Sequence, residues 1–380
     1  MAVRLLEKSA PSAPVSVFAA VGAGSRGRVE RLFYDPRLTR VLSVRQANVL
    51  LVAGSLRDED HDDLRRLHDQ MPPPRATVWW GSDPIFGFDD LTTIAVEDDP
   101  VAAIVAAHRA LIMVERASEP DLLPNEPANP WRGEGPHGQG GKGMMGGTPY
   151  GRPMAMTNDD LRDGLALDAY TAPFGPFLPM LPPGLKLSLT LQGDVVQKAE
   201  VLRPPLAQHD DGPTRALRLR RVARLLRILG LDAHADRLQD ASRASECGEE
   251  VDFAKLRRLV RWSGALAAIP PGLGVVDGRD VRSRMRRWLD ELGVQRPDPA
   301  DPASSEQPAR LVDLLEGLEW TEAILVINSF DDKALLAMAP VEKEDGNAEK
   351  GEGEHHHHDH SSRDHHSAGH AMNHGGGGSA

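Results

Sequence analysis

A stretch rich in glycine and proline, residues 124–168, divides the chain into two unlike parts. It reads PNEPANPWRGEGPHGQGGKGMMGGTPYGRPMAMTNDDLRDGLALD, and glycine and proline at this density exclude a regular helix or strand. Irregular segments of this length are uncommon inside one compact domain. The stretch therefore indicates a connection between two folding units.

The run GQGGKGMMGG inside this stretch, with Lys142 and Arg152 close to it, invites comparison with phosphate-binding loops. It lacks the GxxxxGK[ST] spacing and does not follow a strand and enter a helix, so the comparison is weak. We interpret the stretch as a connecting arm whose glycines let it lie flat against a partner or the second domain. The arm residues considered for contacts are Trp131, Arg132, Gly140, Lys142, Met144, Tyr150 and Arg152.

The composition bounds the class of protein. Hydrophobic residues make up 40% of the 380 residues but aromatic residues only 4%, so the cores must rely on aliphatic side chains. A net charge of −12 argues against nucleic acid as the main partner. No apolar run approaches the ~18–20 residues that span a bilayer. The single cysteine, Cys247, excludes an internal disulfide and any Cys₄ metal or iron–sulfur site within the chain, and we expect a cytoplasmic protein.

Short apolar runs alternate with amphipathic segments before the arm. Runs such as PVSVFA and NVLLVA, flanked by turn-forming residues, are typical of buried strands in a parallel sheet. The predicted strands are 14–19, 48–53, 76–80 and 92–96, and the predicted helices are 57–71 and 100–117. Asp58, Glu59 and Asp60 fall in the first turn of the first predicted helix, where the helix dipole favours carboxylates. The order indicates a small, open α/β sheet.

The sequence VRQANVLLVAGSL…LRRLHDQMPPPRATVWWGSDP resembles the small iron–sulfur subunit shared by respiratory complex I (NADH:ubiquinone oxidoreductase) and the membrane-bound NiFe hydrogenases. The resemblance implies four cluster-ligand positions after the strands, which here fall at Ser25, Arg28, Asp83 and Asp99. None is cysteine, and iron–sulfur clusters need thiolate or, less often, imidazole ligands. We expect the fold without the cluster, and an ion-pair network of Asp83 and Asp99 with Arg28 in its place.

After the arm, YTAPFGPFLPMLPPGLKLSLTLQGDVVQKAEV predicts a β-hairpin with strands at 185–191 and 195–201. It resembles the first strands of the large catalytic subunit of complex I and of the same hydrogenases, in truncated form. The loop that carries a quinone-site histidine in complex I reads Pro173-Phe174-Gly175-Pro176-Phe177 here, without histidine. Residues 202–205, LRPP, replace the motif that leads to the nickel-binding cysteines. The resemblance therefore implies the fold and neither of these sites.

The segments that follow are predicted as a helical bundle. Residues 214–245 have an apolar stripe surrounded by arginines and a break near Gly230, which indicates a helix pair. Further helices are predicted at 251–268, 278–292 and 310–320, a last strand at 323–330, and a helical turn at 331–340. The arginine-rich faces have two readings, a patch for a membrane surface or an acidic partner, and a solvated face neutralised by Asp and Glu from neighbouring elements; we favour the second.

The chain beyond residue 340 is acidic and then rich in histidine. We predict a disordered tail, because such a composition cannot bury a core. Clustered imidazoles bind Zn²⁺ or Ni²⁺ loosely, and no catalytic metal site is expected from an unstructured segment. The histidines concerned are His355, His356, His357, His358, His360, His365, His366, His370 and His374.

These observations predict an α/β fold: a small, open, mostly parallel sheet domain (1–120), a connecting arm (121–166), an α+β domain of β-hairpin and helical bundle (167–340), and a disordered tail (341–380). We expect a fusion of two subunit-like domains that lacks its own cofactor. It would act in docking, coupling or assembly with membrane-embedded, antiporter-like subunits of a complex I-like assembly, at the cytoplasmic face of the inner membrane. The alternatives are a quinone oxidoreductase component that uses clusters on partner chains, and a metal-handling protein that works through its tail.

Overall fold

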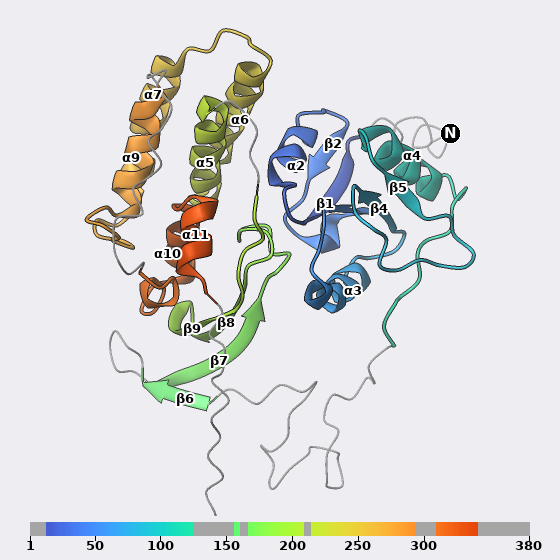
Figure 1. Cartoon of the computed structure of the whole chain (residues 1–380), viewed down its shortest axis with the longest axis horizontal. Helices are drawn as coiled ribbons and strands as arrows, with labels where there is room; N and C mark the ends of the chain where they lie inside the picture. The colour runs from blue at the N-terminus through green and yellow to red at the C-terminus, as the bar shows by residue number, and fades with distance from the viewer. Residues whose placement is uncertain (1–12, 125–155, 160–165, 209–213, 293–308, 341–380) are drawn as a thin grey trace, which may run out of the picture. The chain divides into compact units, whose positions relative to one another are not determined.

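Two β-sheets organise the computed structural model (Figure 1). The second sheet begins inside the stretch 124–168, because β6 (Met156–Asp159) and the start of β7 (Ala166–Phe174) belong to it, so the prediction that this stretch excludes a strand was wrong at its C-terminal end, where glycine and proline are sparse. The structure describes residues 13–124, 156–159, 166–208, 214–292 and 309–340. The first sheet is parallel, in the order β2-β1-β3-β4-β5, and the second is antiparallel, in the order β6-β7-β8-β9. The predicted fold class, an open parallel α/β sheet followed by an α+β region, is confirmed. We call the two regions the N-terminal half and the C-terminal half.

The N-terminal half has helices on both faces of its sheet. Its strands are β1 (Val15–Val21), β2 (Leu38–Arg40), β3 (Val49–Ala53), β4 (Ala76–Trp80) and β5 (Ile94–Val96), and its helices are α2 (Arg26–Leu32), α3 (His61–Asp69) and α4 (Val101–Ile112), with short 3₁₀ turns η2 (Val44–Gln46) and η3 (Asp58–Asp60). One face of the sheet packs against Val29 of α2 and Ile104 of α4. The other packs against Leu64 of α3. Because β1, β3 and β4 are covered on both sides, their sequences are almost continuously apolar.

Two elements of this half, α2 and β2, were not predicted. The α2 sequence, RGRVERL, has only seven residues, and β2 is three residues long. Both are too short to show a clear hydrophobic period, and tertiary packing stabilises them. The addition of β2 beside β1 produces the order 2-1-3-4-5, which is typical of doubly wound α/β folds of the flavodoxin type.

The C-terminal half combines the antiparallel sheet with a helical bundle over one large core. Its strands are β6 (Met156–Asp159), β7 (Ala166–Phe174), β8 (Lys186–Gln192) and β9 (Val195–Arg203). Strands β8 and β9 form the predicted hairpin, with Leu187 and Leu189 of β8 buried in that core. The helices are α5 (Thr214–Ile228), α6 (Asp232–Glu246), α7 (Phe253–Trp262), α8 (Ala265–Ala268), α9 (Val281–Glu291), the 3₁₀ turn η5 (Val312–Leu314), α10 (Trp320–Asn328) and α11 (Asp332–Met338).

Two predictions near the C-terminal end were wrong. Residues 323–330 were predicted as a strand but belong mainly to α10, and residues 310–320 contain η5 rather than a continuous helix. The run AILVIN is apolar on all sides because α10 is buried from Ala323 to Asn328, so its pattern shows no helical period. The helix begins with a capping box between Glu319 and Glu322, although Glu is not a usual N-cap residue.

The two halves are in direct contact, and residues Met1–Glu342 form one compact unit. Phe177, from the loop after β7, is buried in the hydrophobic cluster of the N-terminal sheet with Phe18 and Trp79. The same loop is also bonded to α10 of the C-terminal half: the side-chain amide of Asn328 donates to the Met180 carbonyl oxygen at 2.8 Å. A loop between two strands of the second half is thus part of the core of the first.

Candidate functional site

The four positions implied by the resemblance lie at one edge of the parallel sheet, three of them in loops and Arg28 in the first turn of α2. Ser25 and Arg28 follow β1, Asp83 follows β4, and Asp99 follows β5, so all four lie at the carboxyl ends of parallel strands. In open α/β sheets, ligands bind at this edge where the strand order reverses, here between β1 and β3. This carboxyl edge is therefore the first place in the molecule to examine.

Arg28 fills the space between the loops that follow β1 and β4. Its Nε donates to Ser25 Oγ at 3.2 Å, and its terminal nitrogen donates to the Trp80 carbonyl oxygen at 2.9 Å. The guanidinium carbon lies 4.5 Å from the centre of the Trp80 ring, and a Cβ atom at Gly81 would come within 3.0 Å of the guanidinium. Burial lowers the pKa of Arg28, while the nearby Glu97 acts in the opposite direction.

The expected network of Asp83 and Asp99 with Arg28 does not form. Both carboxylates are exposed, and among the described residues neither makes a hydrogen bond or ion pair to Arg28. Asp99 instead accepts a hydrogen bond from the Val101 amide at 3.0 Å, at the start of α4. The structure brings Ser25 and Arg28 together and leaves the two aspartates outside their contact, because Arg28 is satisfied by a hydroxyl and a backbone carbonyl.

The loop between β1 and α2 contains a signal that the sequence-based expectations did not include. Residues 22–27 read GAGSRG, the GxGxxG spacing that cradles a pyrophosphate when it joins a strand to a helix. Here the second half occupies the loop: the Gly24 amide donates to the Ala207 carbonyl oxygen at 2.9 Å, and the Arg26 amide to Gln208 Oε1 at 3.0 Å. Two amides of the loop are thus paired with the second half, which favours contact between the halves over a nucleotide site.

A cluster of ion pairs, which we call the carboxylate network, joins α3 to the hairpin. Asp60 is fully buried and accepts from Arg57 Nε at 2.9 Å and from Arg203. Asp63 pairs with Lys186 at 2.7 Å and with Arg203. Arg57 also donates to the carbonyl oxygens of Gly184 (2.6 Å) and Pro204 (2.8 Å). Each charged group of this network therefore has partners within it, and Asp60 joins the two halves.

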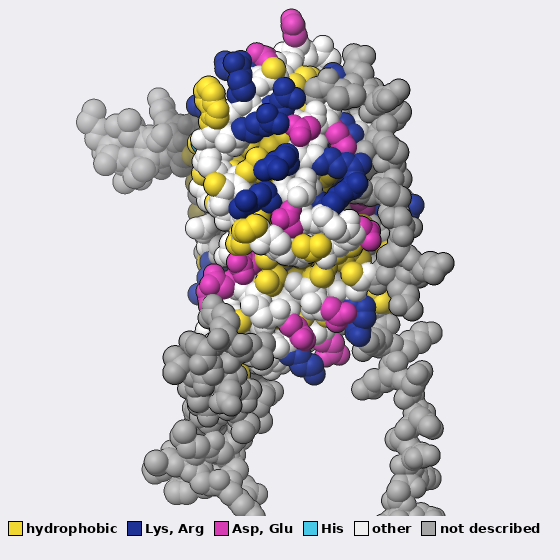
Figure 2. Space-filling view, turned by 90° about the vertical axis from the view of Figure 1, so that its left-hand side faces the viewer, with side chains coloured by type: hydrophobic (Ala, Val, Ile, Leu, Met, Phe, Trp, Pro, Cys, Tyr) yellow, Lys and Arg dark blue, Asp and Glu magenta, His cyan; other side chains and the backbone are white. Residues whose placement is uncertain are grey.

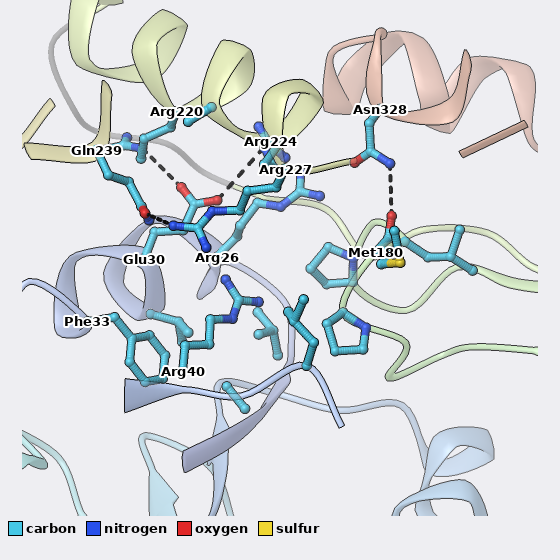
Figure 3. Close-up of a pocket in the computed structure, with 18 of the residues that line it drawn as sticks. Arg26, Glu30, Phe33, Arg40, Met180, Arg220, Arg224, Arg227, Gln239 and Asn328 are labelled. Carbon is cyan, nitrogen blue, oxygen red and sulfur yellow. Dashed lines mark hydrogen bonds and ion pairs between the residues drawn. The ribbon is translucent and has the colours of Figure 1, made fainter. Parts of the chain in front are cut away.

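A pocket of about 420 Å³ lies between the halves on the side of α2 and β2 (Figure 3). Its walls come from α2, β2, the loop at 176–183, the helices α5 and α6, and Asn328. Arginine is its main polar component, and the five arginines that line it are Arg26, Arg40, Arg220, Arg224 and Arg227. We call this cavity the arginine pocket.

Glu30 of α2 is the central carboxylate of the arginine pocket. It is buried, and its oxygens lie 3.0 Å from Arg220 Nε and 3.9 Å from Arg224 Nε, contacts drawn as dashed lines in Figure 3. Arg220, which is 1% exposed, also pairs with Glu246 of α6. The predicted neutralisation of the α5 arginines by neighbouring carboxylates therefore holds for Arg220, but burial rather than solvation surrounds this charge.

The other arginines of the pocket differ in their partners. Arg26 pairs with Asp332 of α11 at 2.6 Å, and Arg227 pairs with Asp236 at 2.7 Å. Burial, followed by the charge of Arg224, lowers the pKa of Arg26 to about 10, although Asp332 and Glu30 oppose the shift. Burial is thus the main cause of the shift, and the repulsion from Arg224 adds to it.

A second set of basic side chains lies on the outer face formed by α7 and α9. Figure 2 shows Lys and Arg gathered there with hydrophobic side chains between them. Trp262, at the end of α7, is 84% exposed, and Arg261 pairs with Asp290 of α9 at 2.6 Å. The exposed basic residues of these helices are Lys255, Arg258, Arg261 and Arg286. We call this surface the basic face.

The remaining predicted site residues lie outside the described residues. These are the arm residues Trp131, Arg132, Gly140, Lys142, Met144, Tyr150 and Arg152, and the nine tail histidines from His355 to His374. Within the described ranges, no group of three or more His, Cys, Asp or Glu side chains is arranged to hold a metal ion. Cys247 is an exposed free thiol at the end of α6.

Comparison with protein-family models gives no match to this chain, and no solved structure matches it. Among the described helices, none combines the length and the apolar character needed to cross a membrane. The carboxyl edge, the arginine pocket and the basic face are therefore the features of the described residues that bear on function.

Proposed function

We propose that this protein is a non-catalytic, complex I-like subunit that acts in docking, coupling or assembly with membrane-embedded, antiporter-like proteins and carries no iron–sulfur cluster of its own. The observation that carries the proposal is the position of Arg28. Its guanidinium is hydrogen-bonded to Ser25 and to the Trp80 carbonyl, at the edge where the resembling family binds its cluster. A cation in that space, with no thiolate beside it, is incompatible with a cluster bound by four cysteines.

The contact between the halves supports the same proposal. In the resembling family the two corresponding subunits pack face to face, and here Ala207 and Gln208 of the second half bond to the loop after β1. The carboxylate network adds buried charge pairs across the same contact. Removing one partner of such a pair is strongly destabilising, so these contacts favour one fixed arrangement of the halves. A scaffold for docking requires a fixed arrangement.

The basic face is the surface we assign to docking. Lys255, Arg258 and Arg286 are exposed on α7 and α9, and so is Trp262 at the end of α7, an aromatic residue of the type enriched at protein interfaces. A cationic surface of this kind is attracted to acidic protein segments of a membrane assembly.

Anaerobic purification with iron and acid-labile sulfide analysis tests the cluster. We expect iron well below one atom per chain after EDTA washing, which removes metal held by the tail. Stoichiometric iron with equal sulfide would overturn the proposal and favour the alternative of an active redox component.

Copurification from native membranes tests docking. The full chain, carrying an affinity tag that does not bind metal, is recovered from detergent-solubilised membranes in the presence of EDTA. We expect multi-span, antiporter-like proteins to accompany it, and to be lost when Arg258→Glu and Arg286→Glu are combined. Arg45→Glu is the matched control, because Arg45 is exposed and lies in η2, outside the basic face. Recovery of the chain without such proteins, or equal recovery with both variants, contradicts the docking assignment.

A further inference from the structure

The arginine pocket contains two guanidiniums whose hydrogen-bonding capacity is unused by the described residues. Arg40, the last residue of β2, has no hydrogen bond or ion pair among them, and its nearest aromatic contact is Phe33 at 5.8 Å. Arg224 of α5 has only the long, 3.9 Å contact to Glu30, and its buried Nε has no hydrogen-bond partner within the described ranges. Most buried polar atoms in proteins are hydrogen-bonded, so the unpaired, buried Nε of Arg224 on a cavity wall indicates a missing partner.

The charge around these two side chains is unbalanced. The pKa of Arg40 is lowered by burial and by the charges of Arg227 and Arg224, and is raised only by Glu30. The carboxylates Asp232, Asp236 and Asp240 also line the pocket as exposed residues of α6, and Asp236 pairs with Arg227 at 2.7 Å rather than with Arg40 or Arg224. Figure 3 shows Arg40 pointing from β2 toward the arginines of α5. A bound anion would relieve this repulsion and accept the unused hydrogen bonds.

Part of the pocket wall is apolar. Phe33 and Leu42 from the N-terminal half face Leu178, Met180 and Ile228 from the C-terminal half. A cavity of about 420 Å³ falls within the range of small-molecule sites, which combine an apolar lining with a few polar groups. The pocket is therefore larger and more apolar than a site for an inorganic anion alone requires.

We propose that the arginine pocket binds a small organic anion, a carboxylate or phosphate monoester with an apolar portion, whose charged group lies between Arg40 and Arg224. Because the two guanidiniums come from different halves, the ligand bridges the halves and stabilises their contact. The carboxylate and the phosphate ester share the same recognition chemistry, a group with several oxygen acceptors opposite two forked donors. This inference is independent of the proposed docking function.

Isothermal titration calorimetry with the full chain tests the pocket. The probes are hexyl phosphate, hexanoate, inorganic phosphate and hexanol, in a buffer free of phosphate and sulfate. We expect saturable binding of hexyl phosphate or hexanoate at one site per chain, weaker binding of inorganic phosphate, and no saturable binding of hexanol. The stronger of the two organic anions identifies the preferred headgroup.

Variants locate the binding. Arg40→Gln and Arg224→Gln should each weaken the organic anion at least about tenfold, because each removes a charge-assisted hydrogen bond. Arg45→Gln, which changes an exposed arginine outside the pocket, should bind like the wild type. Arg40→Lys, which keeps the charge, is added as a second variant that preserves folding and should lose less affinity than Arg40→Gln.

Three results overturn the proposal. The first is that neither organic anion binds saturably to the wild type. The second is that Arg40→Gln and Arg224→Gln bind the organic anion as tightly as the wild type does. The third is that inorganic phosphate binds as tightly as hexyl phosphate. Thermal unfolding of each variant without ligand establishes that a lost signal reflects the pocket rather than an unfolded chain.

Discussion

Two charged regions join the halves of this protein, and they differ in how completely their charges are paired. In the carboxylate network, the buried Asp60 and the nearly buried Asp63 lie among Arg57, Lys186 and Arg203, and each has a partner at hydrogen-bond distance. In the arginine pocket, five arginines share the buried Glu30 and a few peripheral carboxylates.

The difference indicates different purposes. A buried charge is costly unless it is paired, so a purely structural contact is expected to be closed, as the carboxylate network is. The arginine pocket leaves donors of Arg40 and Arg224 unused by the described residues, at a cost in stability that a ligand would recover. We infer that the carboxylate network holds the halves together, and that the arginine pocket binds the proposed organic anion between them.

The largest expected effect is at Asp60, where we predict that Asp60→Asn lowers the free energy of unfolding by about 3–5 kcal/mol, the cost of breaking a buried ion pair. The side chain is fully buried, and loss of its charge leaves Arg57 with carbonyl partners and no carboxylate, and Arg203 with Asp63 as its remaining ion-pair partner among the described residues. Urea denaturation followed by circular dichroism measures the change.

Asp58→Asn is the matched control for Asp60→Asn. Asp58 lies in the same 3₁₀ turn, but its side chain is fully exposed. We expect a small fraction of the effect at Asp60. Equal effects of the two substitutions would show that the acidic turn acts through the helix end, as the sequence pattern suggested, and not through the contact between the halves.

A smaller effect is expected at Glu30, where Glu30→Gln should lower the free energy of unfolding by about 2 kcal/mol through loss of a charged hydrogen-bond partner. The substitution also removes the central negative charge of the arginine pocket, so added hexyl phosphate should stabilise this variant more than the wild type. Thermal unfolding with and without hexyl phosphate measures both effects. If hexyl phosphate stabilised Asp60→Asn as much as it stabilises Glu30→Gln, the ligand would not distinguish the arginine pocket from the carboxylate network.

A third buried carboxylate, Glu119, provides a reference because its hydrogen-bond partners all lie within the N-terminal half, so it does not connect the two halves. It accepts hydrogen bonds from the Thr77 amide at 2.8 Å and the Thr77 hydroxyl at 2.7 Å, and lies 3.2 Å from His68. Burial raises the pKa of Glu119, but the hydrogen bonds of His68 and Thr77 outweigh burial and hold the pKa below its usual range.

The stability due to Glu119 is therefore present above the unfolded-state pKa, near 4.3, and is lost as the pH falls through the lower folded-state value. We expect Glu119→Gln to cost about 1–2 kcal/mol at pH 7 and to reduce the loss of stability in acid. Urea unfolding at a series of pH values below neutrality measures the slope. An unchanged slope in the variant would assign the acid sensitivity to other carboxylates.

The smallest effect on stability is expected from removal of the tail. A chain that ends at Pro340 should unfold like the full chain, because both charged regions are complete within the residues before it. It should also lose the weak binding of Zn²⁺ and Ni²⁺ that the nine tail histidines predict. Titration with each metal and thermal unfolding measure the two properties. Metal binding that survives the truncation would contradict the assignment to the tail.

Several elements were predictable from local pattern alone. Strands β1, β3 and β4 were predicted because buried parallel strands are continuous apolar runs, and the pair α5–α6 because Gly230 interrupts a clear helical period. The strand predicted over residues 323–330 was wrong because a helix buried on all sides has the same apolar composition as a buried strand.

The candidate sites were less predictable than the fold. Arg28 and Ser25 are hydrogen-bonded as neighbours, but Asp83 and Asp99 make no hydrogen bond or ion pair with Arg28. The guanidinium donates instead to the Ser25 hydroxyl and to the Trp80 carbonyl oxygen. The arginine pocket was not predicted at all. In the sequence, the arginines of α5 look like the polar side of an amphipathic helix, and Glu30 and Arg40 lie in elements too short to be recognised.

The sequence by itself determined the class of fold and the position of its buried strands, because these depend on residue type and local period. Only the tertiary structure decided which charges are buried and which remain unpaired. Arg224 lies almost two hundred residues after Glu30 and Arg40 in the sequence. Whether its charge is paired depends on whether the folded chain places a carboxylate or a cavity beside it. The electrostatic energy of a charged side chain is set by its neighbours in space, and for this chain those neighbours come from opposite halves.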